Sequence, residues 1–75
     1  MSDAENRIFR DVYRFFSEHS TPPSVADQEA SAAWWAAASK DIAELSARWR
    51  GYPLMNKLLT AIYEYLEQKA KEAGT

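Results

Sequence analysis

The short stretch WRGYPLM, residues 49–55, decides the fold of this chain. Gly51 suits the left-handed backbone conformation just past the end of a helix, and Pro53 suits the first turn of the next helix. Because the link between them is so short, the helices on either side are expected to fold back on each other as an antiparallel hairpin. A second break, Thr21-Pro22-Pro23, separates this hairpin from an earlier segment, since tandem proline cannot sit inside a helix.

Apolar residues recur at helical spacing in three segments around these two breaks, which predicts helices over about residues 3–19, 25–50 and 53–71. The three apolar stripes comprise Ile8, Phe9, Val12, Phe15 and Phe16; Ala38, Ile42, Leu45 and Trp49; and Met55, Leu58, Leu59, Ile62, Tyr65 and Leu66. No stretch alternates apolar with polar residues, so no strand is expected. The first helix must cover the stripe that the hairpin leaves open, which predicts an all-α antiparallel three-helix bundle in one domain, residues 1–75.

The sequence also indicates where the helices begin and end. Ser2 with Glu5 reads Ser-x-x-Glu, a capping box for the first helix. Ser24 with Asp27 resembles a second capping box, while Asp27 alone is a rival N-cap, so both Val25 and Gln28 remain possible starts of the second helix. Gly74 is expected to close the third helix.

Charge and composition exclude several classes of protein. Nine Lys and Arg residues face eleven Asp and Glu residues, which gives a net charge of −2 with no basic segment. This balance argues against binding to nucleic acid, which relies on clustered cations. Cysteine is absent, so the chain has no disulfide and no thiolate chemistry. The first residues lack the features of a secretory signal, and no apolar run approaches the roughly 20 residues of a membrane span, so a cytoplasmic location is expected.

Catalytic signatures are missing from the sequence. His19 is the single histidine, and no second His or Cys stands at metal-ligand spacing. Its place in the last turn of the first helix suggests a simpler role opposite the C-terminal carbonyls. There is no Gly-x-Ser-x-Gly elbow and no glycine-rich phosphate loop. We therefore expect no catalytic, cofactor-binding or metal-ligating residue, no enzyme activity, no cofactor, and no cleft for chemistry.

Four aromatic residues at the edges of the stripes are the candidate partner-binding residues. Trp34 and Trp35 cannot point the same way, because neighbours on a helix differ by about 100°. Either they lie on the two sides of the apolar stripe of the second helix and both pack against the core, or one of them is partly exposed and anchors a partner. Tyr52 and Tyr63 also lie at stripe edges, where a phenol can bury its ring and leave its hydroxyl in water.

The order of these features resembles a known group of proteins. The pattern begins with the tandem aromatic pair Trp34-Trp35 and continues with the stretch from Lys40 to Trp49. It ends with Tyr52-Pro53-Leu54 and with Ile-Tyr-Glu-Tyr-Leu-Glu at residues 62–67. This pattern, over about the last 45 residues, is similar to short helical proteins of unknown function from gut Firmicutes and their prophages or mobile elements. The resemblance implies a small bacterial or phage-derived accessory protein, and it implies no activity, cofactor or site residue.

These observations predict a non-enzymatic protein-interaction domain of an accessory or mobile-element protein. Its partner is an unidentified protein rather than a membrane, and the chain itself is expected to be a monomer or a weak homodimer. The alternative is a DNA-binding regulator with a helix-turn-helix-like hairpin at Gly51. That motif buries apolar residues six and nine positions after the glycine, where this chain has the polar residues Lys57 and Thr60.

Overall fold

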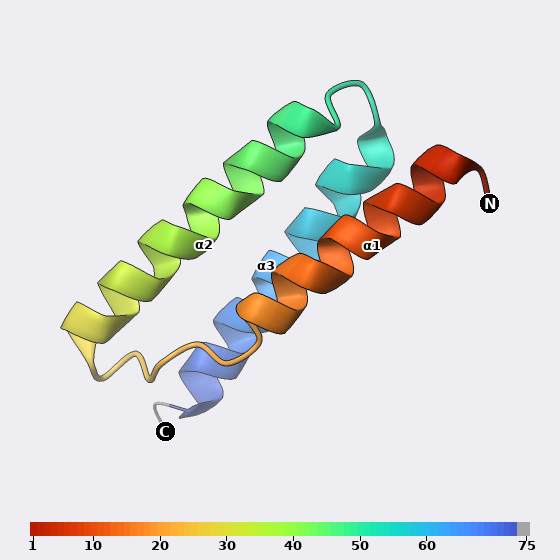
Figure 1. The fold of residues 1–75 in the computed structure, drawn as a ribbon. Helices are drawn as coiled ribbons and strands as arrows, with labels where there is room; N and C mark the ends of the chain where they lie inside the picture. The colour runs from red at the N-terminus through yellow and green to blue at the C-terminus, as the bar shows by residue number, and fades with distance from the viewer. Residues whose placement is uncertain (74–75) are drawn as a thin grey trace.

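The computed structural model describes residues 1–73, and this range folds into three helices without a strand. The helices are α1 (Asp3–Glu18), α2 (Gln28–Arg48) and α3 (Pro53–Ala73). They alternate in direction, and α3 lies behind and between the other two in the view of Figure 1. α3 packs against both α1 and α2. This architecture confirms the predicted all-α antiparallel three-helix bundle. Within the described range, no helix combines the length and the apolar character needed to cross a membrane.

A side-chain cap fixes the start of each of the first two helices. Ser2 Oγ accepts a hydrogen bond from the Glu5 amide at 3.1 Å, and the Ser2 amide donates to Glu5 Oε1 at 2.8 Å, which confirms the capping box. At α2, the Asp27 carboxylate accepts a hydrogen bond from the Ala30 amide at 3.1 Å. Asp27 is therefore the N-cap, and α2 begins at Gln28, the later of the two predicted starts.

The other helix ends differ slightly from the predicted ranges. α2 ends at Arg48 rather than at residue 50, because Trp49 already has the dihedral angles of a C-cap. Gly51 has φ +91°, which confirms the left-handed position, and Pro53 opens α3 as predicted. α3 continues to Ala73, two residues beyond the predicted end. The predicted closure at Gly74 lies outside the described residues.

The core is built mainly from α1 and α3. Its buried residues are Ile8, Val12 and Phe15 of α1, Ala38 of α2, and Met55, Leu59, Leu66 and Ala70 of α3. The larger apolar residues of α2 pack against this core but are only half-buried. They are Trp34, Trp35, Ile42, Leu45 and Trp49. Of the three helices, α2 therefore has the apolar stripe that the bundle covers least.

Two residues assigned to apolar stripes are exposed, so their predicted burial is wrong. Phe9 is 43% exposed and Tyr65 is 52% exposed. Each stands beside a fully buried neighbour, Ile8 or Leu66, and consecutive residues on a helix point about 100° apart. The face that α1 and α3 bury is therefore narrower than the sequence pattern suggested.

Polar contacts join α1 to α2. Trp49 Nε1 donates a hydrogen bond to Asp11 Oδ2 at 2.8 Å, and a nitrogen of the Arg48 guanidinium lies 3.4 Å from the same oxygen. Farther along the junction, His19 Nε2 lies 2.7 Å from Asp41 Oδ2. The junction of α1 and α2 therefore depends on ionisable and polar groups, whereas the sequence predicted that all three apolar stripes close against one another.

Candidate functional site

A groove follows the junction of α2 and α3, and two adjoining hollows form it. The larger hollow, of about 390 Å³, is lined by Ile42, Ser46, Asn56, Leu59, Thr60, Tyr63, Glu64 and Glu67. The smaller hollow, of about 200 Å³, is lined by Val25, Trp35, Tyr63, Glu67, Ala70 and Lys71. Because Tyr63 and Glu67 line both hollows, we treat them as one surface, the α2–α3 groove.

Three of the four predicted partner-binding residues lie close together near this groove. The rings of Trp35 and Tyr63 are 5.2 Å apart at an interplanar angle of 60°. The ring centroid of Trp34 lies 4.6 Å from that of Trp35 and 5.8 Å from that of His19, and the Trp34 ring is nearly perpendicular to both. The two tryptophans therefore point to different sides of α2, with Trp35 towards α3 and Trp34 towards the end of α1, and both are half-buried.

Tyr52, the fourth predicted residue, is not part of this group. It packs edge-on against Trp49, with ring centroids 5.5 Å apart, in the turn that contains Gly51. Ten residues of α3 separate Pro53 from Tyr63, which corresponds to about 15 Å along the helix axis. The predicted set therefore divides into an aromatic cluster at the α2–α3 groove and a separate tyrosine at the turn.

The charge of the α2–α3 groove is negative at its larger hollow. Glu64 and Glu67 are the charged side chains among the residues that line it. Within residues 1–73, neither carboxylate forms an ion pair, since the ion pairs of this range join His19 to Asp41 and Arg48 to Asp11. The groove thus combines apolar and aromatic side chains with Lys71 in its smaller hollow and with two carboxylates that form no ion pair in the described range.

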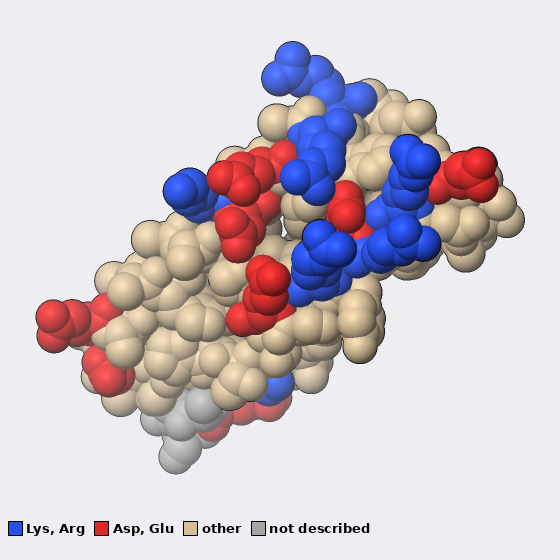
Figure 2. Space-filling model, in the orientation of Figure 1, with Lys and Arg blue, Asp and Glu red and all other residues tan. Residues whose placement is uncertain are grey.

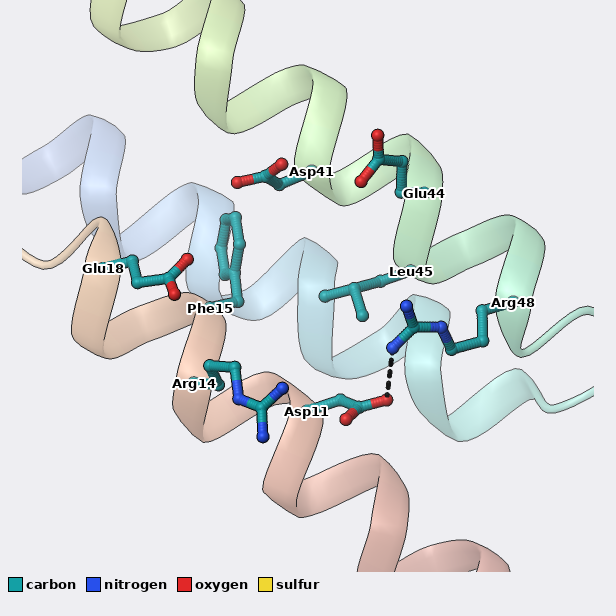
Figure 3. Close-up of a pocket in the computed structure, with 8 residues that line it drawn as sticks. All are labelled: Asp11, Arg14, Phe15, Glu18, Asp41, Glu44, Leu45 and Arg48. Atoms are coloured by element: carbon teal, nitrogen blue, oxygen red, sulfur yellow. Dashed lines mark hydrogen bonds and ion pairs between the residues drawn. The ribbon is translucent and has the colours of Figure 1, made fainter.

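A second groove, of about 160 Å³, lies between α1 and α2 and has a different character. Figure 3 shows Phe15 and Leu45 between charged side chains from both helices. The charged residues that line this α1–α2 groove are Asp11, Arg14, Glu18, Asp41, Glu44 and Arg48. Four carboxylates therefore face two guanidinium groups, an excess of two negative charges. The sequence did not predict this polar groove, and the expectation that the chain has no cleft for chemistry stays a prediction.

His19 lies at one end of this junction, directly after the last residue of α1. Its backbone amide donates to the carbonyl oxygens of Phe15 and Phe16 at 3.0 and 3.3 Å, so it closes the helix. Its side chain is only 12% exposed and contacts Asp41, whose side chain is 38% exposed. Glu18, His19 and Asp41 each offer one ligand atom, and these three atoms lie within 4.8 Å of one another.

The sequence did not reveal this cluster of three residues. Asp41 follows His19 by 22 positions and belongs to another helix. The sequence search for metal ligands looked for His and Cys at short spacing, because such patterns need no knowledge of the fold. The one available signal was a histidine next to a glutamate at the predicted end of the first helix.

In Figure 2, most charged residues of both signs gather on the upper right part of the face, while much of the rest of this face is uncharged. On α3, the residues Lys57 and Thr60 are exposed, where a helix-turn-helix motif would bury apolar side chains. The two helices joined at Gly51 run antiparallel (Figure 1), whereas the helices of that motif cross at about 90–120°. No observation here favours the DNA-binding alternative.

Comparison of the chain with protein-family models, with curated proteins and with solved structures gives no match. The functional argument therefore depends on the geometry and charge of the two grooves.

Proposed function

We propose that this chain is a non-enzymatic protein-interaction domain whose α2–α3 groove binds an amphipathic helix with Lys or Arg beside its apolar face. The observation that carries the proposal is the Trp35–Tyr63 pair next to Glu64 and Glu67, whose carboxylates form no ion pair with any residue of 1–73. Aromatic side chains that are partly exposed at a groove are typical anchors of protein interfaces. We also propose that the chain is an accessory protein, which is the role that the sequence resemblance implies.

The apolar part of the groove supports a helical partner. Ile42 of α2 and Leu59 of α3 line its larger hollow, and Trp35 and Tyr63 continue the surface along the junction. A helix that places apolar residues on one face fits a groove between two helices, as in other helix-in-groove complexes. Ile42 and Trp35, the half-buried apolar residues of α2 that line this groove, would lose contact with water in such a complex.

The charge of the groove supports a basic partner. Glu64 and Glu67 are exposed and stand one helical turn apart, so both can meet cations on the same side of a bound helix. Charges at the rim of an interface mainly set specificity and the association rate rather than the affinity. A basic helix is therefore expected to bind faster than a neutral one, with the apolar contacts determining most of the affinity.

Selection from a display library of helical peptides on the immobilised chain tests the proposal. The selected peptides are expected to share an apolar stripe flanked by Lys or Arg. Their affinity is expected to fall by at least about tenfold for Tyr63→Ala, which removes an anchor. The double variant Glu64→Gln with Glu67→Gln is expected to slow association and to reduce its dependence on salt.

Tyr13→Ala is the matched control, because Tyr13 is a 74% exposed tyrosine on α1, outside the α2–α3 groove. It is expected to bind the selected peptides as the unmodified chain does. The proposal is wrong if no peptide family is enriched, or if the enriched peptides bind Tyr63→Ala as tightly as they bind the unmodified chain.

A further inference from the structure

We propose that Glu18, His19 and Asp41 form a Zn²⁺ site that bridges the end of α1 and the middle of α2. This inference is independent of the proposed function, because it concerns the α1–α2 junction rather than the α2–α3 groove. It starts from the convergence of three ligand atoms, one from each residue, within 4.8 Å of one another. Residues from two helices supply these atoms, so a bound ion would link the helices directly.

The distances suit a small ion after a modest adjustment. In a tetrahedral zinc site with bonds of 2.0–2.1 Å, neighbouring ligand atoms lie about 3.3 Å apart. His19 Nε2 and Asp41 Oδ2 are 2.7 Å apart, so they need to separate by roughly half an ångström. Glu18 is exposed, and its side chain can rotate towards the other two ligands. Figure 3 shows Glu18 on α1 and Asp41 on α2, on opposite sides of one end of the groove and near Phe15.

The chemistry of the three side chains selects Zn²⁺ over Mg²⁺ and Ca²⁺. Magnesium and calcium prefer oxygen ligands alone, whereas an imidazole nitrogen suits zinc and its transition-metal neighbours. One imidazole with two carboxylates gives three protein ligands, and water completes the fourth position. The groove of about 160 Å³ beside Glu18 and Asp41 has room for this water.

The charges around the cluster favour a cation. The α1–α2 groove contains four carboxylates and two guanidinium groups, and the Arg48 guanidinium already pairs with Asp11. The site also lies at the C-terminal end of α1, where the helix dipole places partial negative charge. The last turn of α1 contains no basic residue to compensate that charge. Two cations compete with a bound ion: Arg14 lines the same groove as Glu18 and Asp41, and Lys69 Nζ of α3 donates to the Ser20 carbonyl oxygen at 2.6 Å.

Aromatic side chains fix the imidazole in place. The His19 ring lies 4.9 Å from the Phe15 ring and 5.8 Å from the Trp34 ring, measured between centroids. Its side chain is 12% exposed, so it is largely shielded from water. A ligand held in this way loses little conformational entropy when it binds an ion.

Titration of the tag-free chain with Zn²⁺ tests the site, with calorimetry for the affinity and NMR for the His19 ring signals. We expect one ion per chain and a shift of the His19 ring signals, whereas Mg²⁺ produces neither. Glu18→Gln and Asp41→Asn each remove one ligand charge and are expected to weaken binding by at least about tenfold. Glu44→Gln is the matched control, because Glu44 lines the same groove without belonging to the cluster.

A second readout separates a bridging ion from an ion held by surface carboxylates. Zn²⁺ that links α1 to α2 stabilises the folded state, so it is expected to raise the melting temperature of the unmodified chain and of Glu44→Gln. It is expected to leave that of Asp41→Asn unchanged. The proposal is overturned if millimolar Zn²⁺ leaves the His19 signals unshifted, or if Glu18→Gln and Asp41→Asn bind as tightly as the unmodified chain.

Discussion

Two aspartates, Asp11 and Asp41, make the polar contacts that join α1 to α2. Asp11 accepts a hydrogen bond from the Trp49 indole at 2.8 Å, and its side chain is 16% exposed. A hydrogen bond to a charged group contributes about 1.5–3 kcal/mol, more than a bond between neutral groups. Loss of either aspartate side chain therefore removes a large part of the polar interaction between α1 and α2.

Substitution of Asp11 tests this view. Asp11→Ala is expected to lower the free energy of unfolding by about 1–3 kcal/mol, because it leaves the half-buried Trp49 indole without its acceptor. Arg48→Ala removes only a 63% exposed partner of the same carboxylate and is expected to cost less than about 1 kcal/mol. Urea denaturation followed by tryptophan fluorescence measures both values. Equal losses for the two variants would contradict the role given to the indole hydrogen bond.

Glu5 gives a prediction about pH. Its hydrogen bonds from Ser2, the backbone bond first, lower the pKa of the Glu5 carboxyl below its ordinary value. A lowered pKa in the folded state stabilises the fold above that ordinary value, and this contribution is lost as the pH falls through the folded pKa. NMR titration is expected to show Glu5 ionising at lower pH in the unmodified chain than in Ser2→Pro, which removes both the amide N–H and the hydroxyl of Ser2. The same midpoint in both proteins would be inconsistent with the capping box.

At the scale of the helices, the sequence predicted the elements well because their periodicity is local. The 3.6-residue spacing in each stripe depends only on the geometry of a helix, and Gly51 and Pro53 mark the hairpin without reference to the fold. The width of each buried face depends instead on which helices lie beside it. Phe9 and Tyr65 lie at stripe edges that no neighbour covers fully, so their exposure could not be read from spacing.

The start of α2 yields a prediction that distinguishes the two candidate N-cap residues, Asp27 and Ser24. Asp27 accepts a hydrogen bond from the Ala30 amide inside the helix, whereas Ser24 Oγ accepts one from the Ala26 amide in the preceding loop. Asp27→Ala is therefore expected to lower the free energy of unfolding by about 1 kcal/mol. Ser24→Ala is expected to lower it by only about a few tenths of a kcal/mol. Thermal denaturation followed by circular dichroism compares them. A larger loss for Ser24→Ala would show that the helix begins earlier than Gln28.

At the scale of the whole molecule, α2 has a groove on each side. α3 packs against both other helices, and the described part of the molecule measures 41 × 19 × 17 Å along its principal axes. The sequence identified Trp35 and Tyr63 as candidates because both lie at stripe edges. It could not pair His19 with Asp41, because their approach depends on the path of the loop over residues 19–27 and on how α1 lies beside α2.

The three tryptophans of α2 and its C-cap report on this arrangement most directly, because Trp35 lies at the α2–α3 junction while Trp34 and Trp49 lie at opposite ends of the α1–α2 junction. A nuclear Overhauser spectrum is expected to connect Trp35 with Tyr63, Trp34 with His19, and the Trp49 indole proton with Asp11. These contacts would place α2 between two distinct grooves. If Trp34 and Trp35 both contacted α3 alone, or if the Trp49 indole proton showed no contact with α1, the arrangement described here would be wrong.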